Sequence, residues 1–322
     1  MSEILIAIAL LVVGFVLLIK GADFFVEGSS SVAKILRVPP IIIGLTIVAM
    51  GTSLPECAVS VTASMTGNNA LAVSNVVGSN IFNLMVVSGS CALFAPLLIQ
   101  KQTLFKEFPF SILCGVLLLG AGFLGMSLSR LDGIIFLAIF FCYLAYMIYV
   151  ALAERRKAAA LTLEETEIED DIKIHPMWQC ILFIVGGIIA IKFGGDFVVN
   201  GASTMATFFG LSQNLIGLTI VAVGTSLPEL VTSIVAARKK ELDMALGNVI
   251  GSNIFNVLLI LGIAATLSPI TFIMENVIDI LLLTAMSVLV WFFGWSRQQI
   301  SRKEGISMLV IYAIYLVYIC VR

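Results

Sequence analysis

Ten long apolar runs, separated by short polar connections, dominate the pattern of residues along the chain. Each run is close to the length of about 20 residues that a helix needs to cross a membrane. Strands of a membrane barrel would instead give short alternating segments, and only helices satisfy their backbone within such long runs. We therefore expect an all-α polytopic membrane protein. Its ten predicted transmembrane helices lie near residues 3–20, 40–64, 71–97, 107–127, 132–152, 178–194, 213–236, 245–268, 277–295 and 306–321.

The composition leads to the same class. Of the 322 residues, 60% are hydrophobic and 12% are charged, and no soluble core absorbs so much apolar surface. The net charge of -2 indicates no nucleic-acid partner, because nearly all charged residues lie between the apolar runs. The six cysteines lie in or at the edge of these runs without a close metal-type pair, so we interpret them as small hydrophobic residues.

The chain matches itself at a shift of 173 residues. The segment 44–56 (GLTIVAMGTSLPE) is identical to 217–229 (GLTIVAVGTSLPE) at twelve of thirteen positions, and 75–83 (NVVGSNIFN) matches 248–256 (NVIGSNIFN). With one residue deleted, the match covers essentially the whole chain, which indicates a duplicated unit. We expect a first five-helix repeat at residues 1–153, a linker at 154–176 and a second five-helix repeat at 177–322.

An odd number of helices in each unit predicts that the two repeats are inverted with respect to each other in the membrane. If the connections alternate sides, most basic residues fall on one side, which the positive-inside rule assigns to the cytoplasm. Both termini are then outside. Thr207 and Gly210 of the second repeat occupy the positions that match Lys34 and Arg37 in the first. The basic residues are therefore absent where the matching segment lies on the other side of the membrane. The cytoplasmic basic residues are Lys34, Arg37, Lys101, Lys106, Arg155, Arg156, Lys157, Lys173, Arg238, Lys239, Lys240, Arg297, Arg302 and Lys303.

The linker contains an acidic run from Glu164 to Asp171. A regulatory calcium site is one interpretation, and a solvated flexible connector is the commoner one. The run lacks the Asp-x-Asp-x-Asp-Gly loop that would make calcium binding specific. We therefore expect an acidic cytoplasmic connector.

Glu56 and Glu229 are the only acidic residues well inside the predicted transmembrane helices, and they occupy equivalent places in the two repeats. A carboxylate at that depth is costly and marks a candidate functional site. The alternatives are a glutamate kept protonated and a glutamate that only caps a broken helix. The duplicated placement favours a functional pair.

Helix-breaking residues surround each glutamate. Gly51 and Pro55 precede Glu56, and the segment 224–229 repeats the pattern. Proline removes a backbone donor and clashes with the preceding turn, so we expect each helix to be broken into two half-helices. Ser53 stands three residues before Glu56, which is capping-box spacing with serine as the N-cap. The positive end of the half-helix would then stabilise the carboxylate.

A second motif adds polar residues at a spacing of four, which places them on one face of the next helix. Small glycines beside them allow close packing against the broken helix. Carbonyl groups freed near Ala49 and Ala222 would add further oxygen ligands. An all-oxygen site favours Ca²⁺ and Na⁺ over Zn²⁺ or Cu²⁺, and Mg²⁺ is less favoured because it releases its waters reluctantly. The residues of this face are Asn75, Ser79 and Asn83, which recur as Asn248, Ser252 and Asn256.

These features predict exchange of one ion for another. Two carboxylates carry a charge of -2, which one Ca²⁺ or two Na⁺ would neutralise. Broken helices at corresponding places of inverted halves are the expected location of a transport site. Because the two ions compete for the same charge, the sequence favours an antiporter.

With its paired motifs, the chain resembles the sodium/calcium exchanger family of the calcium/cation antiporter superfamily. The segments 44–56 and 217–229, with 75–83 and 248–256, are similar to the paired alpha repeats of that family, and the layout is similar over all ten helices. The resemblance implies alternating access. The amide at Asn256 differs from the aspartate of some members, including the potassium-dependent branch. The implied ion ligands are Ala49, Thr52, Ser53, Glu56, Ser79, Asn83, Ala222, Thr225, Ser226, Glu229, Ser252 and Asn256.

The leading hypothesis is a secondary antiporter that exchanges Ca²⁺ for Na⁺ in a lipid bilayer. A Ca²⁺/H⁺ antiporter and a K⁺-dependent Na⁺/Ca²⁺ antiporter are alternatives, and a cation channel fits two inverted halves less well. An intramembrane enzyme is not expected, because the sequence has no His-Glu-x-x-His motif. We expect no cofactor and no obligate protein partner. The compact connections suggest the inner (plasma) membrane of a prokaryote.

Overall fold

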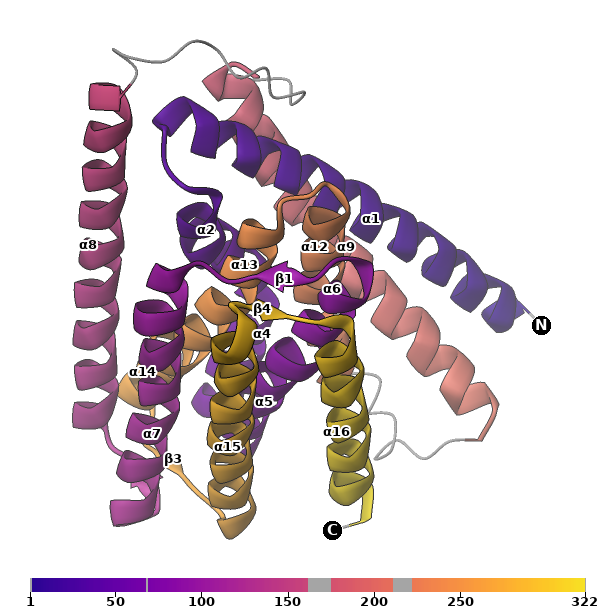
Figure 1. Cartoon of the computed structure of the whole chain (residues 1–322). Coiled ribbons are helices and arrows are strands. Elements are labelled where there is room, and N and C mark those ends of the chain that lie inside the picture. The colour runs from indigo at the N-terminus through magenta and orange to yellow at the C-terminus, as the bar shows by residue number, and fades with distance from the viewer. Residues whose placement is uncertain (1, 68, 162–174, 211–221, 322) are drawn as a thin grey trace.

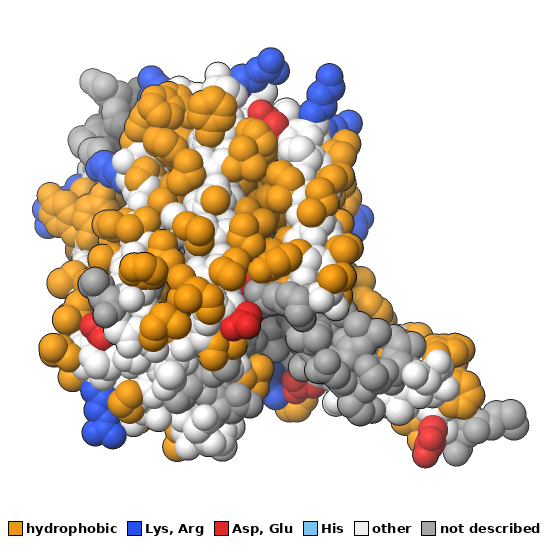
Figure 2. Space-filling model, turned by 90° about the horizontal axis from the view of Figure 1, so that it is seen from below, with side chains coloured by type: hydrophobic (Ala, Val, Ile, Leu, Met, Phe, Trp, Pro, Cys, Tyr) orange, Lys and Arg blue, Asp and Glu red, His pale blue; other side chains and the backbone are white. Residues whose placement is uncertain are grey.

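The computed structural model describes residues 2–67, 69–161, 175–210 and 222–321, and helices make up nearly all of this part of the chain (Figure 1). Eight described helices are long and apolar enough to cross a membrane, and a bent pair, Pro40–Thr52 with Leu54–Met65, adds a ninth. Hydrophobic side chains predominate on the face in Figure 2. The all-α, membrane-spanning class is therefore confirmed. The predicted helix at 213–236 lies partly outside the described residues.

Helices α1 (Ser2–Leu36) and α9 (Met177–Phe208) are longer than the predicted runs 3–20 and 178–194, and they pack side by side in antiparallel fashion (Figure 1). Small residues let the two backbones meet: a Cβ added to Gly187 would lie 2.7 Å from the Gly21 carbonyl oxygen. Close approach through small residues is a common way for helices to associate in membranes. At about 1.5 Å per residue, α1 exceeds the thickness of the hydrocarbon core and crosses the bundle obliquely.

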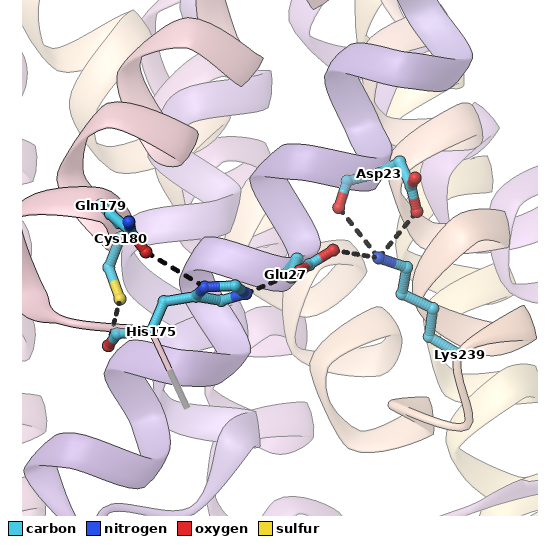
Figure 3. A network of polar contacts seen from close by, with 6 residues as sticks. All are labelled: Asp23, Glu27, His175, Gln179, Cys180 and Lys239. Atoms are coloured by element: carbon cyan, nitrogen blue, oxygen red, sulfur yellow. Dashed lines mark hydrogen bonds and ion pairs between the residues drawn. The ribbon is translucent and has the colours of Figure 1, made fainter. Parts of the chain in front are cut away.

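A polar network ties α1 to the start of α9 and to the end of α12 (Leu227–Arg238) (Figure 3). Lys239 Nζ lies 2.7 Å from Asp23 Oδ1 and 3.3 Å from Glu27 Oε2. The other carboxylate oxygen of Glu27 lies 2.7 Å from His175 Nε2. These half-buried pairs explain why α1 continues as a helix past the predicted end at residue 20. Its charged residues find partners on neighbouring elements.

The predicted helix break is present near Glu56. The chain runs through α2 (Pro40–Ile43), the π-helical segment η1 (Gly44–Val48) and α3 (Ala49–Thr52), then bends by 51° into α4 (Leu54–Met65). In the second copy, α11 (Ala222–Thr225) is followed by α12, with Ser226 between them. The proline at the start of α4 and of α12 is tolerated there, because the first turn of a helix needs no intrahelical donor.

Two long central helices complete the polar core. One runs through α5 (Asn69–Phe82), η2 (Asn83–Val87) and α6 (Ser88–Phe94), and the other through α13 (Leu242–Phe255), η5 (Asn256–Ile260) and α14 (Leu261–Leu267). Both are largely buried. In each, a π-helical segment begins at the last asparagine of the motif, Asn83 or Asn256. Such local widenings of a helix occur often at functional sites.

The remaining helices surround this core. They are α7 (Phe108–Gly125) with its leading segment η3 (Thr103–Glu107), α8 (Arg130–Leu161), α15 (Met274–Arg297) and α16 (Arg302–Val321). Two short antiparallel pairs join their ends: β1 (Leu97–Leu98) with β4 (Gln299–Ile300), and β2 (Ser127–Leu128) with β3 (Ile270–Thr271). The two pairs occupy matching places in the repeated sequence, so they connect the halves reciprocally.

Candidate ion site

Glu56 and Glu229 both lie inside the protein. Each stands in the first turn of a half-helix, α4 or α12, and neither side chain is exposed. The free N–H groups and the dipole at a helix start favour a negative charge there. The predicted placement of the two carboxylates at helix breaks is confirmed.

The serines before the two glutamates connect the halves of the molecule. Ser53 Oγ donates to Glu229 Oε1 at 2.9 Å, and Ser226 Oγ donates to Glu56 Oε1 at 3.2 Å. Both serines are N-cap residues, as predicted, but neither makes a side-chain capping hydrogen bond. The predicted capping box is therefore wrong. Each serine hydroxyl instead donates to a buried carboxylate. Hydrogen bonds to charged groups are stronger than those between neutral groups.

Ser79 of α5 joins the same cluster. Its hydroxyl lies 3.2 Å from Glu56 Oε1 and 2.9 Å from Ser226 Oγ. Two hydroxyls, one from each half of the chain, thus meet at one oxygen of Glu56. The sequence-based prediction that the face of Ser79 packs against the broken helix is correct for this residue.

The second copy of the polar motif makes different contacts around Asn248. Thr52 Oγ1 lies 3.1 Å from Asn248 Oδ1, and Ser252 Oγ lies 3.5 Å from the same oxygen. Asn248 in turn donates to Ser233 Oγ at 2.9 Å. The hydroxyl of Ser252 therefore faces an amide, whereas its counterpart Ser79 faces a glutamate. The two copies of the motif do not present identical oxygens.

A pair of asparagines outside the predicted ligand set joins the two central helices. Asn80 Nδ2 donates to the Asn253 carbonyl oxygen at 3.1 Å, and Asn253 Nδ2 donates to the Asn80 carbonyl oxygen at 3.2 Å. Asn80 Oδ1 also accepts from Asn256 Nδ2 at 2.9 Å. The available signal was their recurrence in the repeated motif at residues 75–83 and 248–256. Their role is to hold α5 against α13 and to orient Asn256.

The carbonyl oxygens expected at the breaks are only partly available. Ala49 O accepts from the backbone N–H of Ser53 at 3.1 Å and lies 3.4 Å from Thr52 Oγ1. The prediction that the break frees this carbonyl is wrong, because the chain continues to the N-cap serine with helical bonding. A carbonyl oxygen has two lone pairs, so Ala49 can still face an ion. Ala222 begins α11 and Thr225 ends it, and residues 211–221 before them lie outside the described residues.

Several buried oxygens in this core have no hydrogen-bond partner among the described residues. They include Glu56 Oε2, Glu229 Oε2, Asn83 Oδ1 and Asn256 Oδ1. Buried polar atoms are almost always satisfied, so each exception needs an explanation. Carboxylate and amide oxygens are the ligands that Ca²⁺ and Na⁺ prefer, and the described residues nowhere bring together three His, Cys, Asp or Glu side chains as a transition-metal site would. The donor set fits a hard cation.

Comparison with known proteins settles the family. The family model described as "Sodium/calcium exchanger protein" matches residues 6–149 and 179–321. The chain belongs to the sodium/calcium exchanger family. The predicted resemblance is thereby confirmed, and this exchanger family member is a membrane protein that carries out antiport of Na⁺ and Ca²⁺.

Individual relatives are similar over four-fifths or more of the chain. The inner membrane protein YrbG of Escherichia coli (strain K12) is 38% identical over 269 residues, which cover 82% of this chain and 81% of YrbG. The sodium/calcium exchanger MaX1 of Methanosarcina acetivorans is 30% identical, with 96% and 97% of the chains covered. A solved structure of the sodium-calcium exchanger NCX_Mj, soaked with Na⁺ and Sr²⁺, matches with a TM-score of 0.83 at 30% identity, and covers 98% of this chain and 99% of that chain.

Proposed function

We propose that Glu56 and Glu229 hold Ca²⁺ and Na⁺ in turn and that this exchanger carries them across the membrane by alternating access. The observation that carries the proposal is the reciprocal pair of hydrogen bonds between the serine of one half and the glutamate of the other. Both carboxylates keep an oxygen without a partner among the described residues. Because neither side chain is exposed, an ion reaches them only after a change of conformation.

Charge balance explains exchange at such a site. Two ionised glutamates carry a charge of -2, which one Ca²⁺ or two Na⁺ neutralise. A loaded site is close to neutral and can cross in an enclosed state, whereas an empty site leaves two charges buried, at a cost of several kcal/mol. Binding of one ion therefore displaces the other, and reorientation without an ion is slow.

The ligand set extends beyond the glutamates. The oxygens best placed in the described core belong to the two half-helix starts and to the two central helices. Ser252 belongs to this set although its hydroxyl faces Asn248 Oδ1, because a hydroxyl that donates its proton keeps lone pairs for an ion. The proposed ligands are Ala49, Thr52, Ser53, Glu56, Ser79, Asn83, Ala222, Thr225, Ser226, Glu229, Ser252 and Asn256.

The same proposal includes the architecture of ten transmembrane helices in two inverted repeats, at 1–153 and 177–322. Contacts that recur at a shift of 173 residues support it, namely the serine–glutamate pairs and the Asn80–Asn253 pair. The antiparallel packing of α1 on α9 supports it as well, because these helices begin the two copies. By the positive-inside rule, the acidic linker at 154–176 lies in the cytoplasm and both termini lie outside. YrbG is named an inner membrane protein, and we propose the same location here.

Flux of radioactive Ca²⁺ in vesicles reconstituted with the purified protein tests the function. We expect uptake only when Na⁺ is present on the opposite side, and no uptake driven by a K⁺ or H⁺ gradient alone. The amide at Asn256 is consistent with independence from K⁺. Ca²⁺ flux that persists without any opposing Na⁺ would exclude Na⁺-coupled antiport and would favour the proton-coupled or channel alternative.

A further inference from the structure

Asn248 is a buried residue of α13 that contacts two proposed ligands without being one of them. Its side-chain nitrogen donates to Ser233 Oγ on α12 at 2.9 Å. Its Oδ1 atom lies 3.1 Å from Thr52 Oγ1 on α3 and 3.5 Å from Ser252 Oγ on its own helix. One amide therefore joins the hydroxyls of two proposed ligands to the half-helix that carries Glu229.

The matching asparagine of the first repeat shows which way this amide points. Asn75 Nδ2 lies 2.9 Å from Ser60 Oγ and 3.4 Å from the backbone carbonyl oxygen of Glu56. A carbonyl oxygen only accepts, so the nitrogen of this amide faces α4. Asn248 Nδ2 makes the same contact at 2.9 Å with Ser233, which matches Ser60 in the repeated sequence. The oxygen of Asn248 is thereby directed at the two ligand hydroxyls.

A hydroxyl that binds a cation offers it a lone pair, so its single proton needs an acceptor elsewhere. For Ser252, Asn248 Oδ1 is the only hydrogen-bond partner among the described residues. The neutral acceptors around Thr52 are Asn248 Oδ1 at 3.1 Å and the carbonyl oxygens of Val48 and Ala49 at 3.2 and 3.4 Å. The carbonyl of Ala49 is itself a proposed ligand. Asn248 can accept the proton of either hydroxyl without occupying a ligand oxygen.

The charge of a bound ion makes this acceptor necessary. Thr52 also faces the Glu229 carboxylate, and a charged acceptor attracts a hydroxyl proton more strongly than an amide does. In the ion-free site, the proton of Thr52 can therefore point at Glu229. A cation held by Glu229 repels that proton, which then turns to a neutral acceptor. Asn248 Oδ1 accepts it, and the lone pairs of Thr52 are left to the ion.

We propose that Asn248 is a positioning residue for ion exchange: it accepts the hydroxyl protons of Thr52 and Ser252 and so directs their lone pairs at an ion beside Glu229. This inference rests on the proposed function, because the two hydroxyls are ligands only under it. The first repeat orients its hydroxyl differently, since Ser79, the counterpart of Ser252, has a glutamate oxygen within reach as its acceptor.

The Ca²⁺ concentration that gives half-maximal protection against thermal unfolding tests this role on the purified protein in detergent. Outer-shell partners of metal ligands typically contribute roughly 10- to 100-fold in affinity, so Asn248→Ala should raise this concentration at least about tenfold. Asn248→Ser, whose shorter side chain keeps a polar atom in the buried site but no longer reaches both hydroxyls, should show the same loss. If both variants bound Ca²⁺ as the unaltered protein does, the proposal would be wrong.

Ser233→Ala is the matched control for the structural part of the role. It breaks the same hydrogen bond to α12 but leaves Asn248 Oδ1 beside the two ligand hydroxyls. Like Asn248→Ala, it should lower the unfolding temperature measured without ions, yet it should bind Ca²⁺ like the unaltered protein. Equal weakening of Ca²⁺ binding by Ser233→Ala and Asn248→Ala would assign the effect to helix packing and overturn the proposal.

A double variant shows whether Asn248 acts through a ligand hydroxyl. In a chain that carries Ser252→Ala, adding Asn248→Ala should raise the half-maximal Ca²⁺ concentration by a smaller factor than in the unaltered chain. A residue that only supports the fold would give the same factor in both, and that result would contradict the positioning role. If Ca²⁺ failed to protect even the unaltered protein, the ion site itself would be refuted, so the two failures are distinguishable.

Discussion

Ser53 Oγ lies 2.9 Å from Glu229 Oε1, although the two residues are 176 positions apart in the chain. The reverse contact, from Ser226 to Glu56, spans 3.2 Å. Each N-cap serine therefore donates a hydrogen bond to the carboxylate of the opposite half. As a result, the geometry of each carboxylate depends on how the two broken helices are held together, and an ion bound there acts on both halves at once.

The first prediction concerns the carboxylates. Glu56→Gln and Glu229→Gln keep the shape of the side chain but remove the charge that balances the ion. Loss of one charged ligand from a buried site costs about 2–5 kcal/mol, so Na⁺-dependent Ca²⁺ flux should fall roughly 30-fold or more in either variant. The measurement is initial Ca²⁺ uptake into vesicles. The matched control is Glu275→Gln at an exposed position in the first turn of α15, where flux should be unchanged.

The second prediction concerns the serines that cross between the halves. Ser53→Ala removes a hydrogen bond to a charged acceptor, an effect of about 1.5–3 kcal/mol, and should weaken the apparent Ca²⁺ affinity roughly tenfold or more. If the hydroxyl acts through Glu229, then adding Ser53→Ala to Glu229→Gln should have little further effect. Ser64→Ala is the control, because Ser64 is equally buried on α4 but donates to the Ala264 carbonyl oxygen. Fully additive losses in the double variant would contradict the crossed arrangement.

Much of the site could be predicted from local sequence patterns and from their recurrence in the second copy. The depth of Glu56, the proline before it and the recurrence at Glu229 were enough to predict two broken helices with a carboxylate at each break. What sequence spacing could not supply was the partner of Ser53. The spacing Ser53 to Glu56 fits a capping box, but a local pattern does not reveal that another carboxylate, brought in by the fold, competes for the same hydroxyl.

The length of the first helix also could not be predicted from the sequence pattern. The run at 3–20 predicted a first helix, yet α1 continues to Leu36, because Asp23 and Glu27 meet Lys239 and His175. Charged residues mark the end of an apolar run, but they end a helix only when no partner is near. Likewise, hydrophobic periodicity gives no signal for the π-helical segments that begin at Asn83 and Asn256.

The third prediction tests the contact between the central helices. Asn80 and Asn253 donate to each other's backbone carbonyl, so replacing either by alanine removes a buried hydrogen bond between the two central helices, an effect of about 0.5–1.5 kcal/mol. Each single variant should therefore unfold at a lower temperature in detergent. Asn80→Ala should also impair Na⁺-dependent flux more than Asn253→Ala, because only Asn80 accepts from Asn256. Equal flux in the two variants would show that orientation of Asn256 does not matter.

The fourth prediction concerns Lys239, which neutralises two carboxylates of α1. Lys239→Met leaves Asp23 and Glu27 without their cation. Since all three side chains are about one-third exposed, we expect a loss of only roughly 0.5–1 kcal/mol, and less in high salt. Thermal unfolding at two salt concentrations measures it. Lys240→Met, at the exposed neighbouring residue, should unfold like the unaltered protein, and an equal loss in both variants would assign the effect to general surface charge.

The fifth prediction uses two adjacent glycines of α9. A methyl group at Gly187 would lie 2.7 Å from the Gly21 carbonyl oxygen and 2.7 Å from Phe25 Cβ, so Gly187→Ala forces α1 and α9 apart. Overpacking of this kind costs about 1–3 kcal/mol. Gly186→Ala places its methyl group more than 4 Å from any described neighbour, and alanine favours a helix over glycine by up to about 1 kcal/mol. Thermal unfolding should therefore move in opposite directions for these neighbouring substitutions. If both variants unfolded at the same temperature, close packing of α1 on α9 would not contribute to stability.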